Sequence, residues 1–394
     1  MSSVFIHIFI ISIFLSIIST LLIRQLALRL RIIDWPEIGG RKIHLQPVPL
    51  LGGLAIFLTF FIILFLIYFS PFWPVKKFSF FEVLPKNLNL VTIKQIVGLL
   101  LASIFLMIGG FLDDKYHLKP KQQIVWSILA ALVVIISGIG IRYINNPFGL
   151  GYLYFDKWKF EIFRFQGVPF HFTPLADLFT FVWLMILMYS TKLLDGLDGL
   201  VSGISVIGGL IIAGLCLVTR FYQPDVAILA IIFAGASLGF LFFNFHPAKI
   251  FLGEGGSLFA GFMLGSLAII SGGKIATAFL VLGLAILDIF FVIIRRIFIE
   301  HKSPFSAGRE HLHFKLLDIG FSHCSAVIFL WLVALIFGGL ALFLRTQGKI
   351  IILGILIILM IFLVIYITFK ERQISKNKIY SLRSSTGSLR ENQK

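Results

Sequence analysis

The chain has 394 residues, of which 59% are hydrophobic and 13% are charged, and its mean hydropathy is +1.01. Soluble domains carry about 25% charged residues, so this composition excludes an ordinary soluble domain and indicates a polytopic membrane protein. The net charge of +16 would suggest a nucleic-acid partner in a soluble protein. Here the basic residues lie between apolar runs, where anionic lipid headgroups and membrane orientation explain them, and we expect no nucleic-acid partner.

Apolar runs of about 20 residues recur along the chain, and runs of this length span a bilayer as helices. We therefore expect an all-α fold with about eleven transmembrane helices, at roughly 4–23, 50–70, 94–112, 122–141, 174–194, 199–219, 225–245, 255–272, 274–299, 323–344 and 350–369. The first run is long enough to span, so we expect a retained helix and not a cleaved signal. Residues 1–369 would form a single integral-membrane domain, and residues 370–394 a basic, disordered cytoplasmic tail.

The connectors between these runs divide by charge. One side has two long connectors, 71–93 and 142–173, and the alternation from Tyr152 to Phe165 in the second indicates a small hairpin. The other side carries most of the 34 lysines and arginines, in the tail and in the loops 24–49, 113–121, 195–198, 246–254 and 300–322. The positive-inside rule places this second side in the cytoplasm and the N-terminus outside.

The polar motifs divide in the same way. The cytoplasmic loops contain "RKIHLQPVPLLGG" (41–53), "GGFLDDKYHLKPKQQ" (109–123), "LLDGLDGL" (193–200), "NFHPAKIFLGEGGS" (244–257) and "SPFSAGREHLHFKLLDIGFS" (303–322). The opposite loops contain nothing comparable. We therefore expect one cytoplasmic site, built from five loops.

Five carboxylates stand out at the edges of the apolar runs. Asp113 and Asp114 are adjacent, Asp195 and Asp198 share a helix face at i,i+3, and Glu254 lies in a glycine-rich turn. Clustered acids near hydrocarbon repel one another unless a cation neutralises them. A hard divalent ion such as Mg²⁺ fits, because it binds carboxylates and fills its coordination shell with water and substrate phosphate. No set of Cys and His has zinc spacing.

Each acidic motif also has a structural interpretation. The aspartate pair could be a solvated helix end, the "DGLDG" segment a polar helix-breaking turn, and Glu254 an N-terminal cap favoured by the helix dipole. The glycines of "DGLDG" could serve helix packing alone, although we expect them also to let the backbone approach a ligand. Asp288, with Arg295 and Arg296 two turns further on, fits a helix-stabilising charge arrangement or a wall of the site equally well.

Basic residues could supply the other half of such a site. Arginine binds phosphate oxygens in bidentate fashion, and lysine or histidine adds charge and donors. Single residues of this kind are ordinary loop flanks, but two groups favour a function: Arg41, Lys42 and His44, and Arg309, His311 and His313. We expect His7 and His246 to be structural. Metal-binding acids and phosphate-binding cations at a membrane surface imply phosphoryl chemistry between a soluble donor and a lipid.

From about residue 34 to about residue 322, these five motifs in this order resemble the polyprenyl-phosphate N-acetylhexosamine-1-phosphate transferases, the WecA/MraY group of glycosyltransferase family 4. The spelling "HLH" at 311–313 is closer to the undecaprenyl-phosphate N-acetylglucosaminyl-1-phosphate transferase branch. The resemblance implies a Mg²⁺-dependent membrane enzyme, with Mn²⁺ as a substitute. It would transfer a sugar 1-phosphate from a UDP-sugar to undecaprenyl phosphate and release UMP, as the first membrane step of cell-envelope glycan synthesis. The family also suggests a homodimer in the inner membrane.

The motifs and the resemblance together give the residue assignments. The catalytic residues would be Asp113, Asp114, Asp195, Asp198 and His311. The substrate-binding residues would be Arg41, Lys42, His44, Lys192, Asn244, Arg309 and His313. The metal ligands would be Asp198, Glu254 and Asp114. A phosphate dianion is already a nucleophile near neutral pH, so a general base is dispensable, and Asp114 is the weaker choice for one.

The chain departs from the family's motifs at three positions. Lys192 stands where asparagine is usual, Glu254 where aspartate is usual, and Phe314 where a histidine is usual. Lys192 could bind another phosphate oxygen or pair with Asp195. These departures leave the sugar donor open. They also leave open a second interpretation, in which the protein is a catalytically impaired paralogue that binds lipid or acts as a scaffold. A transporter would need charges at the middle of several spans, and Asp288 alone qualifies.

Overall fold

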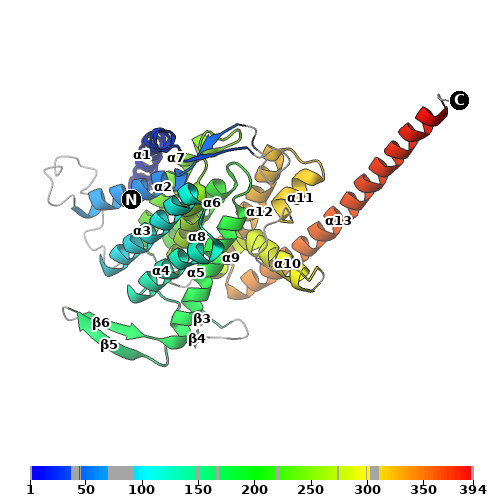
Figure 1. Cartoon of the computed structure of the whole chain (residues 1–394). Coiled ribbons are helices and arrows are strands. Elements are labelled where there is room, and N and C mark those ends of the chain that lie inside the picture. Colours follow the sequence, from blue (N-terminus) through cyan, green and yellow to red (C-terminus); the bar gives the residue numbers. More distant parts are fainter. Residues whose placement is uncertain are drawn as a thin grey trace.

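The computed structural model describes residues 2–36, 44, 46–69, 93–146, 149, 151–165, 168–218, 222–272, 275–298, 300–301 and 310–391. The chain folds into a bundle of helices with three small two-stranded sheets (Figure 1). The helices are α1 (Ser2–Arg29), α2 (Gly52–Phe69), α3 (Ile93–Tyr116), α4 (Pro120–Ile136), α5 (Pro174–Leu194), α6 (Leu200–Val218), α7 (Pro224–Asn244), α8 (Gly253–Ile270), α9 (Ile275–Val281), α10 (Gly283–Phe298), α11 (Leu312–Asp318), α12 (His323–Phe343) and α13 (Thr346–Glu391).

The described part of the chain has eight helices that are long and apolar enough to cross a membrane, or nine if one bent pair counts as a span. The helices α2 and α4 are apolar but shorter. Each of the eleven apolar runs is helical over most of its length, because apolar residues without internal proline favour helices that satisfy their own backbone groups. The expectation of an all-α polytopic membrane protein is confirmed, and the count of eleven spans stays a prediction.

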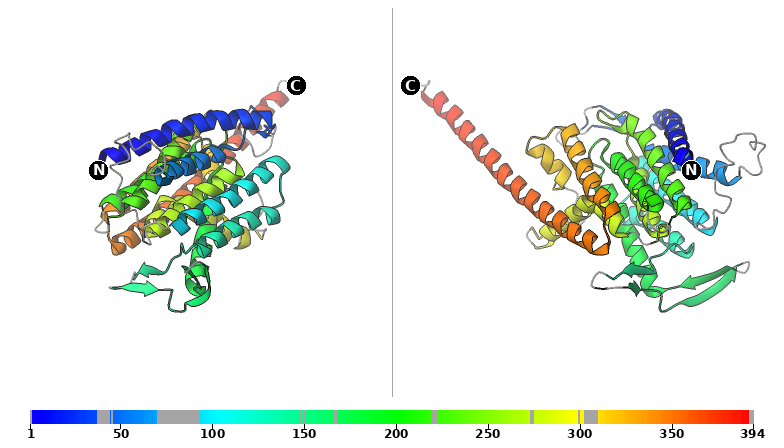
Figure 2. Two further views of the ribbon diagram at one scale, coloured as in Figure 1. Left: turned by 90° about the vertical axis from the view of Figure 1, so that its left-hand side faces the viewer. Right: turned by 180° about the vertical axis from the view of Figure 1, so that it is seen from behind.

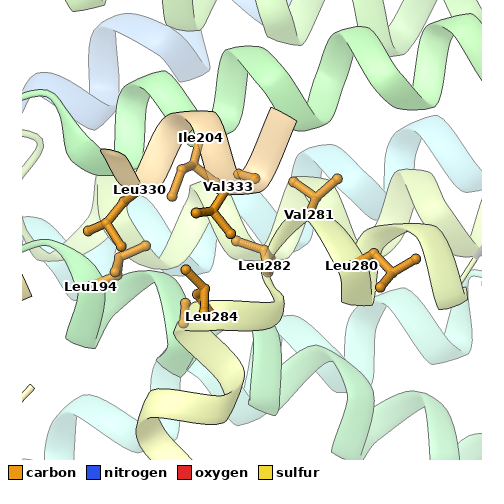
Figure 3. Close-up of a pocket in the computed structure, with 10 residues that line it drawn as sticks. Leu194, Ile204, Leu280, Val281, Leu282, Leu284, Leu330 and Val333 are labelled. Carbon is orange, nitrogen blue, oxygen red and sulfur yellow. The ribbon is translucent and has the colours of Figure 1, made fainter. Parts of the chain in front are cut away.

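The ninth expected span is broken, which corrects the single helix expected over 274–299. The helices α9 and α10 meet at an angle of 75° around Leu282. A small apolar cavity lies at this bend (Figure 3). It is lined by residues of several helices: Leu194, Ile204, Leu280, Val281, Leu282, Leu284, Ala285, Leu330, Val333 and Ala334. Because the run is apolar on both sides of the bend, hydropathy alone does not reveal the change in direction.

The C-terminal segment is the second correction. We expected a disordered tail from residue 370, but α13 continues to Glu391 and projects away from the bundle (Figures 1 and 2). Residues 370–391 contain no proline and several lysines, arginines and glutamates. These residues have good helix propensity, so the last helix extends beyond its apolar part.

The sheets are antiparallel pairs outside the bundle. One pairs β1 (Ile33–Asp34) with β2 (Val48–Pro49), and the expected hairpin region contains two more. These are β3 with β4 and β5 with β6, whose bounds are Tyr143–Asn145, Tyr152–Tyr154, Phe160–Phe165 and Val168–Phe172. The two hairpins lie together at the lower edge of the view in Figure 1.

Helix α8 lies in the middle of the bundle, against α2, α3, α5, α6 and α7. Glycines allow the close approach: a Cβ added at Gly110 of α3 would lie 2.2 Å from the Cα of Gly255 in α8. On the other side, Thr191 Oγ1 of α5 donates a hydrogen bond to the carbonyl oxygen of Ser257 in α8, at 2.7 Å. This packing brings the ends of α3 and α5 to the start of α8.

Candidate active site

The start of α8 is joined directly to the end of α3. The backbone N–H of Glu254 donates to Asp114 Oδ1 at 3.0 Å. Gly253 has a φ of +74°, and a Cβ at that position would lie 2.3 Å from Asp114 Oδ2. Only glycine satisfies both the backbone conformation and this contact. The motifs at 109–123 and 244–257 therefore meet through the carboxylate of Asp114.

Lys192 of α5 reaches the same place. Its ammonium forms an ion pair with Glu254 Oε1 and donates to Gln123 Oε1 at 2.8 Å. Gln123 Nε2 in turn donates to Asp113 Oδ1 at 2.8 Å. Asp113 Oδ1 also accepts the backbone N–H of Leu118 at 2.9 Å, so this carboxylate organises the turn between α3 and α4. Sequence reasoning did not single out Gln123, although it lies at the end of the quoted motif.

Asp195 follows the last residue of α5 and is partly buried. Burial, and then the negative charges of Glu254 and Asp198, raise the pKa of Asp195 from its usual 3.8 to about 7. The carboxyl group of Asp195 therefore lies close enough to Glu254 and Asp198 for their charges to interact with it.

The raised pKa gives a pH-dependent stability with a defined sign. Between about pH 4 and pH 7, folded Asp195 holds a proton that the unfolded chain has released, so the free energy of unfolding falls as pH rises through this window. We expect the melting temperature of the detergent-solubilised protein to fall over this range, and Asp195→Asn to reduce the slope. The exposed Asp318→Asn serves as the control. Identical slopes for Asp195→Asn and the parent protein would contradict the pKa assignment.

Asp198 lies in a different set of contacts. Its Oδ2 accepts from His246 Nδ1 at 2.8 Å and from the backbone N–H of Ala248 at 3.1 Å. The ring of His246 stacks on that of His323, with centroids 4.1 Å apart. His246 was expected to be structural, and His323 was missed, because 77 residues separate it from its partner and no local pattern marks it.

The predicted magnesium ligands are not gathered as expected. Among the described residues, one set of three potential ligands has donor atoms within 4.8 Å of one another, and it is Asp198, His246 and His323. Asp114, Asp198 and Glu254 do not meet that condition, and each is held by a protein partner. The residues therefore do not fit a divalent ion held as the sequence predicted.

The histidine motif is fixed from α10. His311 is buried, and its Nδ1 donates to Asp288 Oδ2 at 2.9 Å. The other oxygen of Asp288 accepts the backbone N–H of Leu312 at 2.9 Å, and Arg296 Nε donates to Glu310 Oε2 at 2.8 Å. Of the two interpretations of Asp288, the structure favours the wall of the site. The contact occupies Nδ1 and leaves Nε2 as the other ring nitrogen of His311.

The second histidine packs on the "DGLDGL" turn. A Cβ added at Gly196 would lie 2.3 Å from His313 Nε2 and 2.9 Å from Phe314 Cζ. The rings of His311 and His313 are parallel within 3°, with centroids 5.8 Å apart. We expected the glycines of this turn to make room for a ligand, and the first of them makes room for a histidine.

Asn244 holds the same turn from α7. Its Oδ1 accepts from the N–H of Gly199 at 3.1 Å and from Ser202 Oγ at 2.7 Å, and its Nδ2 donates to the carbonyl oxygen of Ile250 at 3.0 Å. The residue is 3% exposed, so its amide organises the loop. The expected contact of Asn244 with substrate stays a prediction.

The first motif is joined to the loop before α8. His44 Nε2 lies 3.6 Å from Asp34 Oδ2, and the His44 ring meets that of Phe251 edge-on, with centroids 5.2 Å apart. The backbone N–H of Gly52 donates to the carbonyl oxygen of Phe251 at 2.9 Å. Three further predicted substrate-binding residues, Arg41, Lys42 and Arg309, lie outside the described residues.

The fold and this site define a class of protein, a multi-pass membrane protein with a polar site. Five motifs that are separate in the sequence contribute described residues to the site, which contains acids, a lysine and histidines. A glycosyl transferase family 4 model matches residues 96–272. A probable undecaprenyl-phosphate N-acetylglucosaminyl 1-phosphate transferase of Bacillus subtilis is 30% identical over 362 residues, covering 90% of this chain and 89% of the relative. The chain therefore belongs to glycosyl transferase family 4, as its motifs predicted.

Two other relatives show the breadth of this similarity. A decaprenyl-phosphate N-acetylglucosaminephosphotransferase of Mycolicibacterium smegmatis is 28% identical over 358 residues, with 83% of this chain and 79% of the relative covered. A phospho-N-acetylmuramoyl-pentapeptide-transferase of Prochlorococcus marinus is 27% identical over 340 residues, with 80% and 84% covered. The similarity extends over most of each chain.

Proposed function

We propose that this protein transfers N-acetylglucosamine 1-phosphate from a UDP-sugar to undecaprenyl phosphate and releases UMP. The observation that carries the proposal is the meeting of the acidic and histidine motifs around Lys192, Glu254 and the "DGLDGL" turn. The names of the Bacillus and Mycolicibacterium relatives, which specify N-acetylglucosamine phosphate transfer to polyprenyl phosphates, support the choice of sugar and lipid.

The proposed reaction is a phosphoryl transfer. An oxygen of the lipid phosphate attacks the β-phosphorus of the UDP-sugar, the bond from that phosphorus to the bridging oxygen breaks, and UMP leaves with that oxygen. A phosphate dianion needs no general base, so catalysis depends on positioning and on charge stabilisation.

Two described side chains, Lys192 and His311, suit the diphosphate. The ammonium of Lys192 has three N–H donors, of which Glu254 and Gln123 use two, so one remains for a phosphate oxygen. His311 Nε2, fixed through Asp288, provides a second contact. Mg²⁺ would neutralise the diphosphate when bound. Because the residues assigned to it are held by protein partners, no step of the proposed reaction is routed through the ion.

The proposed location is the inner membrane, with the site facing the cytoplasm and the N-terminus outside. This orientation is supported by the basic residues in the loops that form the site. A lipid substrate suits a site that lies at the ends of apolar helices. Homodimerisation stays a prediction.

One assay tests this function. Purified protein in detergent, with undecaprenyl phosphate and a panel of radiolabelled UDP-sugars, should form a labelled lipid from UDP-N-acetylglucosamine. The assay is run with added Mg²⁺ and with chelator, so that a metal requirement does not hide turnover. No labelled lipid from any donor, in protein shown to be folded, would instead favour the lipid-binding scaffold, which the Lys192–Glu254 pair within the acidic site makes the second candidate.

A further inference from the structure

Two of the three departures from the family's motifs contact each other. Lys192 and Glu254 are 62 residues apart in the sequence and form an ion pair between α5 and α8. Both side chains are largely enclosed, with exposed fractions of 19% and 14%. A surface ion pair contributes little to stability, but an enclosed one fixes the position of its charges. The pair is therefore a feature of the site and not of the surface.

The ammonium of Lys192 lies in a prepared position. Gln123 Nε2 donates to Asp113 Oδ1 at 2.8 Å and to the carbonyl oxygen of Leu118 at 3.1 Å, so the Gln123 amide is held with Oε1 toward Lys192. The ring of Tyr189, one turn earlier on α5, has its centroid 5.5 Å from the same ammonium. A carboxylate, an amide oxygen and an aromatic ring thus surround the charge.

Several acidic side chains lie around this position. Glu254 contacts Asp114 through its backbone, and Asp113 is joined to Lys192 through Gln123. Asp195 follows the last residue of α5, three residues after Lys192. A divalent ion bound to Glu254 would face the ammonium at close range, and like charges repel strongly in a partly dehydrated site. The carboxylate of Glu254 can therefore bind the ammonium of Lys192 or a metal ion, but binding one weakens binding of the other.

We infer that the ammonium of Lys192 is a resident cation that occupies the position on Glu254 that a divalent metal ion would take, so Glu254 is not a metal ligand in this protein. Resting on the proposed function, the same ammonium holds the diphosphate of the sugar donor through its remaining N–H. Transfer then does not depend on a metal ion at Glu254.

Direct binding of Mn²⁺ tests this inference without any assay of turnover. The full-length protein in detergent is titrated with Mn²⁺, and electron paramagnetic resonance reports the free ion. We expect the Glu254→Gln variant to bind as much Mn²⁺ as the parent protein does. Lys192→Asn should add one binding site, and Lys192→Asn with Glu254→Gln should lose that site again. Any Mn²⁺ bound at Asp198, His246 and His323 would be the same in the parent, the two single variants and the double variant, so it would not affect the comparison.

The matched control is Lys315→Asn. Lys315 also forms an ion pair with a glutamate, Glu371, at 3.0 Å, and its side chain is 15% exposed. Its loss should leave Mn²⁺ binding unchanged. A parent protein that binds Mn²⁺ in a manner abolished by Glu254→Gln would overturn the inference. A folded Lys192→Asn variant that gains no site would overturn it too, because removing the resident cation should open its position.

Turnover separates this inference from the proposed function. If the parent protein makes labelled lipid, chelation should reduce its rate less than threefold, whereas Lys192→Asn should lose at least tenfold on chelation and recover with Mg²⁺. If the parent protein forms labelled lipid only when Mg²⁺ is present, the inference that transfer needs no metal ion is wrong, but the proposed transferase function is supported. No product under any condition would count against the function, and the Mn²⁺ titration would still decide the place of Lys192.

Discussion

Replacing His311 with alanine should reduce the rate of labelled-lipid formation by about 10²–10⁴-fold, the range typical for a side chain that handles charge or a proton at the reacting group. His311 is buried, and Asp288 holds its Nδ1, so Nε2 is presented in one orientation. Alanine removes the donor and leaves the carboxylate of Asp288 without its histidine. The measurement is the initial rate with a saturating donor, on protein whose melting curve shows that it is folded.

Asp288→Asn separates positioning from direct contact. The amide keeps the size of the side chain but removes the charge that orients His311, so we expect an intermediate loss of about 10–100-fold. The loss should lie mainly in kcat, with a shift in the pH profile that a merely structural role would not produce. His7→Ala, at a histidine near the start of α1, should have no effect. A His311→Ala rate within threefold of the parent would remove this histidine from the mechanism.

Asp198→Asn should abolish turnover while the protein stays folded and inserted in the membrane. One carboxylate oxygen of Asp198 accepts both the Nδ1–H of His246 and the backbone N–H of Ala248. Asparagine retains one oxygen acceptor but loses the negative charge beside His246 and His323. Loss of that charge should change the binding of a phosphate group or a cation at this end of the site.

The control for this variant is Asp318→Asn, at the exposed end of α11. Turnover and the melting temperature are measured for both variants. Near-normal turnover of Asp198→Asn would exclude Asp198 from catalysis and from metal binding. A large fall in its melting temperature, with turnover retained per folded molecule, would show that the Asp198–His246 contact serves stability alone.

The sequence predicted the fold class well because the signal for membrane helices is local. An apolar run of about 20 residues must satisfy its backbone groups internally, so its position can be read directly. The bend at Leu282 could not be read, since "LVLGLAI" is equally apolar on both sides. The helical tail after residue 370 was missed because charge was taken as a sign of disorder, whereas lysine, arginine and glutamate are good helix formers.

The site was predicted less completely, because its pairs are remote in sequence. The motifs identified Asp114, Glu254 and His311, but not the partner of each. Lys192 was expected near Asp195 or a phosphate, and it pairs with Glu254 across two helices. The role of Asp288 stayed open until the structure showed its contact with His311, 23 residues away.

In the proposed reaction, a phosphoryl group moves together with the sugar. The direct measurement uses UDP-N-acetylglucosamine labelled with ³²P at the β-phosphate, incubated with purified protein and undecaprenyl phosphate. We expect the label to enter the lipid fraction in step with the appearance of unlabelled UMP. Label that remains in water-soluble UDP while sugar reaches the lipid, or that never leaves the donor in the presence of folded protein, would contradict the account.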